Sequence, residues 1–131
     1  MSHDRFDLFR ACMEGVVFQT RWMMESFDTS SLGSIRLAGG ASKSPVWSQI
    51  IADIMQLPVH IPAVPDLACV GAAVIAGWGA GIFGSIGDGC RALKVETTTL
   101  SPDPSVINKY ENSYRLYKQQ AECLWDLYRI S

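Results

Sequence analysis

The chain has 131 residues, which is enough for one domain with a modest hydrophobic core and too few for two domains. Its 11 basic and 13 acidic residues give a net charge of −2, and no cluster of lysines or arginines offers the positive surface that nucleic-acid binding requires. Four scattered cysteines form no Cys-x-x-Cys pair, the two histidines add no metal-ligand spacing, and no signal segment is recognisable, so we expect reduced thiols, a cytoplasmic location and no metal site.

Residues 4–27 are predicted to form an amphipathic helix. Apolar residues recur there at alternating steps of three and four, which is the spacing of one helix face. We expect this stripe to face the core; it consists of Phe6, Phe9, Met13, Val16, Thr20, Met23 and Phe27. Polar residues that lie mostly off the stripe are expected on a solvated face; they are Glu14, Gln19, Arg21 and Glu25. Gly15 inside the helix indicates a close helix crossing.

A strand, a pair of glycines and a helix follow one another between residues 35 and 55. Residues 35–38 form a short β-branched and apolar run between glycine-containing turns, which is typical of a buried strand. Ser44 is suited to cap the helix, and Pro45 suits its first position, where the missing N–H of proline costs nothing. Gly39 and Gly40 between them let a ligand such as a nucleotide approach the backbone, although the same dipeptide also forms ordinary tight turns.

The helix over residues 44–55 leads to a second short strand at 59–61, which has a proline at each border. Two strands joined by one helix predict a right-handed crossover and parallel strands. The inward residues of the helix are expected to be Val46, Ile50, Ile51 and Ile54. Neither the spacing of a phosphate-binding loop nor that of a dinucleotide fingerprint occurs here.

Residues 67–87 carry no charge, and their length approaches that of a membrane-spanning helix. Six glycines within this stretch argue against a membrane span. We expect instead a buried helix over residues 67–76, followed by a mobile, glycine-rich loop over 77–89. Small residues are expected to let another backbone pack closely on this helix; they are Ala68, Gly71, Ala72, Ala73 and Ala76.

A strand-like run at residues 94–100 precedes a long amphipathic helix that begins near Asp103 or Ser105. Its inward stripe consists of Ile107, Tyr110, Tyr114, Tyr117, Ala121, Leu124 and Tyr128. Three tyrosines at helical spacing are compatible with a stacking platform, but such a stripe is more often part of a core. The order of elements predicts an α/β fold with a short parallel sheet and flanking helices. Because parallel sheets normally have several strands and two covered faces, part of the sheet is expected to be missing.

Four parts of the sequence carry a family resemblance. They are Ser2-His3-Asp4-Arg5 with residues 9–11 and 14–15; residues 39–45 with Trp47 and residues 51–53 and 58–59; residues 67–81, above all Gly71-Ala72-Ala73; and Pro102-Asp103-Pro104 with Tyr110, Tyr114 and Tyr117. Together they resemble the C-terminal lobe of the FGGY carbohydrate kinases, the family that includes xylulokinase, gluconate kinase and glycerol kinase. The resemblance covers nearly all of residues 1–131.

This resemblance implies a partial actin-like, ribonuclease-H-like lobe that binds the adenosine part of ATP, with Mg²⁺ and the phosphates held mainly by other parts of the enzyme. The implied adenosine-binding residues are Gly39, Gly40, Ala41 and Ser44. No catalytic residue of the family can be matched to this sequence, because the catalytic Asp, the sugar pocket and the first strands of the lobe belong to other segments. Asp53, Asp66 and Asp88 are expected only as surface charges or helix caps. Ala41 replaces the third glycine of many relatives, and this makes the path of the loop uncertain, because alanine disfavours positive φ.

Two interpretations remain open at the level of sequence. The chain is either the nucleotide-binding part of an ATP-dependent sugar kinase, inactive on its own, or a non-catalytic interaction fragment with a kinase-derived fold. If strands that normally precede Ser2 are absent, then residues 35–38 or 59–61 present an open sheet edge. We therefore expect the chain to self-associate, most simply as a two-fold homodimer.

Overall fold

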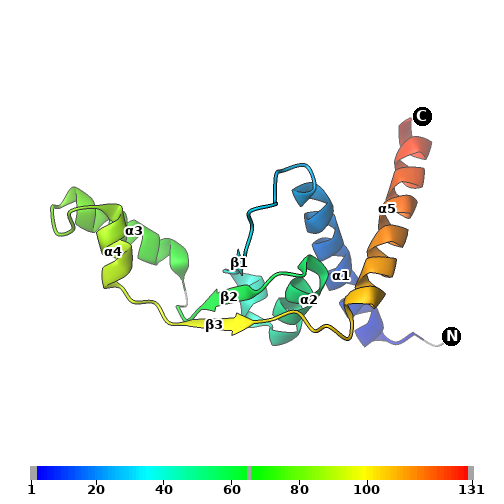
Figure 1. The fold of residues 1–131 in the computed structure, drawn as a ribbon, viewed down its shortest axis with the longest axis horizontal. Coiled ribbons are helices and arrows are strands. Elements are labelled where there is room, and N and C mark those ends of the chain that lie inside the picture. The colour runs from blue at the N-terminus through cyan, green and yellow to red at the C-terminus, as the bar shows by residue number, and fades with distance from the viewer. Residues whose placement is uncertain (1–2, 65, 130–131) are drawn as a thin grey trace.

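The computed structural model describes residues 3–64 and 66–129, and it describes side chains as far as residue 125. The elements in chain order are α1 (Arg5–Met24), β1 (Ile35–Arg36), the 3₁₀ helix η1 (Gly40–Lys43), α2 (Pro45–Met55), β2 (Val59–Pro62), α3 (Leu67–Gly79), α4 (Ile86–Ala92), β3 (Thr97–Leu100) and α5 (Ile107–Arg129) (Figure 1). Ser2 and the side chain of Tyr128, which appear in the sequence-based predictions, lie outside this described part.

The three strands form one small mixed sheet in the order β1-β2-β3. β1 pairs in parallel with β2, with Ile35 opposite Val59, which confirms the predicted parallel pair. β3 adds an antiparallel strand, with Leu100 opposite Val59 on its other side. The first strand ends at Arg36 rather than residue 38, although the Leu37 N–H still donates to the His60 carbonyl at 2.9 Å.

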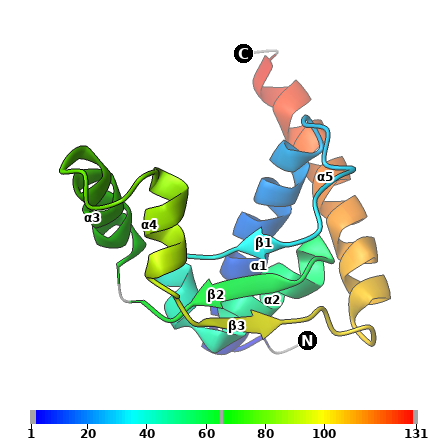
Figure 2. The ribbon, with the colours of Figure 1, turned by 60° about the vertical axis from the view of Figure 1, so that its left-hand side comes forward.

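Helix α2 lies against the sheet, and α1 and α5 pack on α2 (Figures 1 and 2). The core between these helices consists of Val17, Phe18, Ile50, Ile54, Tyr110 and Tyr114. Ser44 caps α2 as predicted, and Pro45 occupies its first turn. Val46, which was expected to face inward, is exposed because this first turn extends beyond the core.

The expected inward stripe of α1 is mostly exposed, so that prediction is wrong. Phe6, Phe9, Val16, Met23 and Phe27 lie on the surface, whereas Val17 and Phe18 are the buried residues of the helix. The physical reason is that apolar residues occur on more than one side of α1, and α2 and α5 cover only one of them. A Cβ atom added to Gly15 would find no atom within 4 Å, so the expected close crossing is absent there.

The polar side chains that were expected on the solvated face of α1 instead face α5. Glu14 accepts a hydrogen bond from the Tyr110 hydroxyl at 2.9 Å, Glu25 from Tyr114 at 2.6 Å and Gln19 from Tyr117 at 2.7 Å. The three rings also surround Phe18, with centroid separations of 6.3, 5.8 and 5.6 Å. The tyrosines are therefore part of the core, and their hydroxyl groups join the two helices.

The electrostatics of this contact favour an ionised Glu25. Hydrogen bonds from Lys118 and then from Tyr114 lower the pKa of Glu25. Burial, followed by the hydrogen bond to Glu25, raises the pKa of Tyr114, so its hydroxyl stays a donor. The contact thus pairs a charged acceptor with a neutral donor, which is a strong form of hydrogen bond.

Arg21, on α1, joins three helices at the C-terminal end of α2. Its guanidinium donates to the Ile54 carbonyl at 2.9 Å, forms an ion pair with Glu111 at 2.6 Å and lies over the ring of Tyr114, with 4.4 Å between Cζ and the centroid. Gln56, the left-handed residue that ends α2, also donates to Glu111. Cations are favoured at a helix C-terminus because they neutralise its unpaired carbonyls.

A second helix forms where a mobile loop over residues 77–89 was expected. α3 continues to Gly79, and α4 packs against it around the ring of Phe83. A Cβ atom at Gly77 would lie 2.6 Å from this ring and one at Gly89 would lie 2.9 Å away, so the close approach requires both glycines. The expected role of the small residues of α3 is wrong in this chain, because Ala68, Ala72, Ala73 and Ala76 are exposed.

The four cysteines, Cys12, Cys69, Cys90 and Cys123, are free and exposed. Within residues 3–64 and 66–129, no helix has both the length and the apolar character that crossing a bilayer demands.

We predict that Arg21→Met lowers the free energy of unfolding by about 2 kcal/mol, since it removes a charged hydrogen bond to a helix end together with an ion pair. Arg115→Met is the matched control, because Arg115 is exposed on α5 and its side chain bonds only to the neighbouring Asn112. The control should stay within about 0.5 kcal/mol of the parent. Urea denaturation followed by circular dichroism measures both, and equal losses would show that Arg21 does not join the helices.

Candidate functional site

The candidate site lies at the carboxyl ends of the two parallel strands. β1 leads there into Gly39 and η1, and β2 leads into the connection to α3. Figure 2 shows both strands pointing toward the side on which α3 and α4 stand. Ligands of open α/β sheets bind outside the carboxyl ends of the strands. We refer to residues 39–44 as the glycine corner.

Backbone geometry makes the glycine corner accessible. Gly39 has φ 78° and ψ −153°, a combination that is essentially restricted to glycine. Gly40 does not have a positive φ, and a Cβ atom added to it would find no atom within 4 Å. Both residues are exposed, so a ligand can approach the main chain without meeting a side chain.

Serine hydroxyl groups fix the path of the glycine corner. Ser42 donates to the Gly39 carbonyl at 2.8 Å, and the fully buried Ser48 donates to the Ala41 carbonyl at 3.3 Å. Ser44 accepts from the Trp47 N–H at 3.3 Å and so caps α2. Ala41 fits this path within η1, because it does not need a positive φ.

The sequence predicted Gly39, Gly40, Ala41 and Ser44 as adenosine-binding residues and did not indicate the two supporting serines. Ser48 lies one helical turn after Ser44, and this i, i+4 spacing was the available signal that both face the same end of the loop. Nothing in the sequence indicated the role of Ser42, because its hydrogen bond to the Gly39 carbonyl forms only once the 3₁₀ turn has folded.

The N-terminus of α3 follows β2, whose carboxyl end lies at the same edge of the sheet as the glycine corner. Asp66 caps it by accepting from the N–H groups of Ala68 at 2.9 Å and Cys69 at 3.1 Å. The hydrogen bonds from Cys69, and to a smaller extent those from Ala68 and the charge of Lys43, lower the pKa of Asp66. Asp66 is thus a helix cap, as expected, and it is already engaged.

The other two acidic candidates differ from one another. Asp88 is exposed and bonds to Ser85 and Arg91, as expected of a surface charge. Asp53 is buried, which contradicts the expectation of a surface role. Its carboxylate accepts from Gln49 Nε2 at 2.8 Å and from the Asp103 N–H at 2.9 Å, and thereby fastens α2 to the segment that precedes α5.

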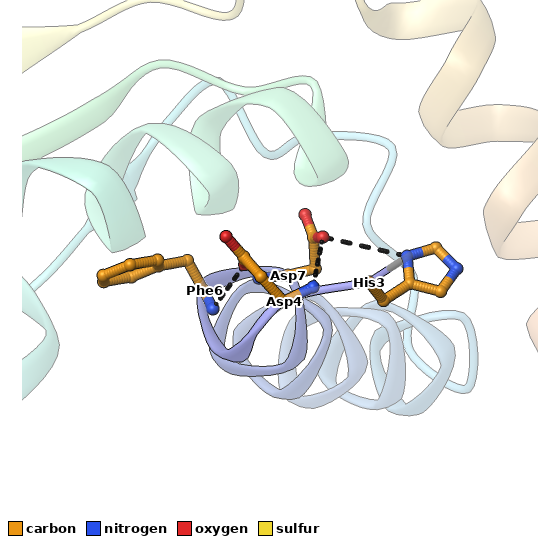
Figure 3. A network of polar contacts seen from close by, with 4 residues as sticks. All are labelled: His3, Asp4, Phe6 and Asp7. Atoms are coloured by element: carbon orange, nitrogen blue, oxygen red, sulfur yellow. Dashed lines mark hydrogen bonds and ion pairs between the residues drawn. The ribbon is translucent and has the colours of Figure 1, made fainter. Parts of the chain in front are cut away.

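Paired carboxylates at the start of α1 also have a structural role. Asp4 accepts from the N–H groups of Phe6 and Asp7, at 2.8 and 3.0 Å, while Asp7 accepts from the Asp4 N–H at 3.0 Å. Figure 3 shows these residues at the start of the helix. This reciprocal pattern is a capping box. His3 lies 3.8 Å from Asp7 and is exposed.

The chemistry available at the glycine corner is recognition rather than proton transfer. Exposed backbone and small side chains suit a flat, uncharged group such as a nucleoside. Within the part of the chain that the structure describes, no three His, Cys, Asp or Glu side chains come together as metal ligands.

An open groove of about 660 Å³ lies elsewhere, between the C-terminal halves of α1 and α5, and is lined by Gln19, Trp22, Met23, Ser26, Ala121, Glu122 and Trp125.

Comparison with known proteins decides the family. The model of the FGGY family of carbohydrate kinases, C-terminal domain, matches residues 1–80, which include the glycine corner. The chain belongs to this family. The match confirms the resemblance inferred from the four sequence motifs.

Two relatives from Escherichia coli (strain K12) extend the match beyond residue 80. L-xylulose/3-keto-L-gulonate kinase is 33% identical over 120 residues, which cover 88% of this chain and 24% of the relative. Autoinducer-2 kinase is 38% identical over 109 residues, covering 81% of this chain and 21% of the relative. The FGGY chain thus spans about a quarter of the length of these kinases.

Solved structures confirm the actin-like kinase fold. Xylulose kinase from Rhodospirillum rubrum superimposes with a TM-score of 0.77 at 29% identity, covering 98% of this chain and 27% of that protein. Plasmodium falciparum glycerol kinase with ADP gives a TM-score of 0.72 at 23% identity, covering 93% and 25%, and supports the fold alone.

We predict that Gly39→Ala lowers the free energy of unfolding by about 1–3 kcal/mol, because alanine is strained at the φ and ψ of this residue. Gly40→Ala is the matched control, since the new methyl group enters open space, and it should cost less than about 0.5 kcal/mol. Thermal unfolding of both variants measures the difference. If the two glycines tolerate alanine equally, the strained turn that we describe does not form in solution.

Proposed function

We propose that the chain is the adenosine-binding part of an ATP-dependent sugar kinase, which phosphorylates a hydroxyl group of a sugar or polyol. The observation that carries this proposal is the exposed glycine corner at the carboxyl ends of parallel strands, inside the segment that matches the FGGY C-terminal domain. The similarity to kinases acting on L-xylulose and on autoinducer-2 supports an alcohol acceptor. Which sugar is phosphorylated depends on residues outside this chain.

Each residue of the corner has a proposed role. The backbones of Gly39 and Gly40 approach the adenosine, the methyl group of Ala41 lies against the adenine, and Ser44 lies near the base. ATP would supply the γ-phosphoryl group, and Mg²⁺ would neutralise the charge that develops during its transfer. The described residues fit the nucleoside but offer no cluster of ligands for Mg²⁺, so we assign the metal and the phosphates mainly to the rest of the enzyme.

The catalytic base is not assigned to this chain. The carboxylate of Asp66 caps α3, and the buried Asp53, near the C-terminal end of α2, is held by two hydrogen bonds. A group in either situation is poorly placed to accept a proton from a sugar. The alternative, a non-catalytic interaction fragment that does not bind nucleotide, is an outcome of the first test below.

Two further features belong to the same proposal. The outer edge of β1 has no neighbouring strand among the described residues, and this supports self-association of the isolated chain as a homodimer. Four free thiols support a cytoplasmic location.

We predict weak binding of adenine nucleotide by this chain, and we predict that Gly40→Val abolishes it. Valine would place a branched side chain where the base lies, yet it should leave the fold intact because the space beside Gly40 is open. NMR titration with ATP and with adenosine measures the amide shifts of residues 39–44. Unshifted amides at millimolar nucleotide would favour the interaction fragment, and equal binding by the variant would exclude this corner as the site.

We also predict no sugar phosphorylation by this chain alone, because phosphoryl transfer needs an aligned hydroxyl group, a base and clamped phosphates. A coupled assay with ATP and Mg²⁺ across pentoses, hexoses and polyols is the measurement. The matching full-length E. coli kinase serves as the positive control. Sustained turnover of about 1 s⁻¹, at the low end for kinases, would show that the catalytic groups are present here after all.

A further inference from the structure

Helix α3 is apolar on all sides, which is unusual for a helix at the surface. Residues 67–87 contain no charged side chain. A helix that is apolar all round is normally buried all round, because one face in water would carry polar residues. The outward side of α3 carries Ala68, Ala72, Ile75 and Ala76, which recur at helical spacing and are all exposed. We call these four residues the outer face of α3.

Within the described chain, only α4 packs extensively on α3. This contact buries Val74 and Gly77 on the side opposite the outer face. Figures 1 and 2 show the two helices projecting from the body as an arm. Trp78 and Ile82 extend the apolar surface of the arm, with 49% and 73% of their area exposed.

The position of the arm indicates what covers it. The arm begins at Asp66, which follows β2 at the sheet edge where the nucleotide is proposed to bind, and the charge of Lys43 in the glycine corner lowers the pKa of Asp66. Phosphoryl transfer there requires a second set of groups facing the nucleotide, and about three quarters of each relative lies outside the matched segment. The uncharged helix α3 therefore stands at the sheet edge that these groups must face.

We infer that the outer face of α3 docks onto the remaining three quarters of an FGGY kinase and thereby fixes that part against the nucleotide corner. This inference rests on the proposed kinase function. The apolar, small-residue surface matches a close packing contact between helices or with a sheet, and it lacks the charges of a solvated or electrostatically steered surface.

The test replaces the matched quarter of E. coli L-xylulose/3-keto-L-gulonate kinase with this chain. Ala72→Glu is made in this fusion and in the 131-residue chain by itself. Gln120→Glu is the matched control, because it adds the same charge to an exposed position of α5. We expect Ala72→Glu to lower the melting temperature of the fusion by about 5 °C or more and that of the single chain by less than about 1 °C. The control should change neither protein.

Other outcomes overturn the inference. Equal destabilisation of fusion and single chain would mean that α3 is packed within this chain, and an unchanged fusion would mean that the outer face stays in water. If Ala72→Glu instead converts an oligomer of the single chain into monomers, the occupant is a second copy.

A separate measurement covers a fusion that does not fold. The chain and the remaining part of the E. coli kinase are then co-expressed as two polypeptides, and capture of one by a tag on the other is compared with and without Ala72→Glu. No capture, or capture that Ala72→Glu leaves unchanged, would overturn the inference. Nucleotide binding is read independently through Gly40→Val, so the proposed function can fail while docking stands.

Discussion

The contact of Arg21 with the end of α2 is the interaction on which the geometry of the glycine corner depends. Arg21 holds the C-terminal end of α2 through the Ile54 carbonyl, and it ties that end to α5 through Glu111. The other end of the same helix is the corner itself, since Ser44 caps it and Ser48 holds Ala41. A helix is stiff over its 11 residues, so a displacement at one end becomes a displacement of the other. The corner is therefore positioned in part by α1 and α5, which hold the far end of α2.

The contact between α1 and α5 combines an apolar core with polar groups at its rim. Tyrosine rings pack around Phe18, and their hydroxyls reach Glu14, Gln19 and Glu25 at the rim, where water still screens the charges. Hydrogen bonds require a fixed register, whereas apolar packing alone tolerates sliding. Among the described residues, Trp47 Nε1 is the one buried side-chain nitrogen or oxygen without a partner. It lies on α2 as well, so the helix that carries the corner is also the one with a locally unsatisfied group.

The sequence predicted the parts whose signals are local. The cap at Ser44, the proline after it and the parallel strand pair follow from neighbouring residues, and the structure contains the cap, the helix and the pair. The predicted binding roles of Gly39, Gly40, Ala41 and Ser44 came from the family resemblance. α4 was missed because glycines normally break helices, and here Phe83 packing against Gly77 and Gly89 overrides that preference. The partners of Glu14 and Glu25 were missed because they lie about 90 residues away in the sequence. Periodicity does not identify which side of α1 is covered when apolar residues occur on several sides.

The wrong predictions of buried faces on α1 and α3 have the same physical explanation. The spacing of apolar residues on a helix indicates which faces of that helix are buried in the complete protein. Phe6, Phe9 and Val16 on α1 and the outer face of α3 are apolar yet exposed in these 131 residues. The chain spans about a quarter of the length of its relatives, so most of their sequence has no counterpart in these 131 residues. The outer face of α3 is the stripe that we propose to be covered by the rest of a kinase, and α3 begins at the sheet edge to which the glycine corner also belongs.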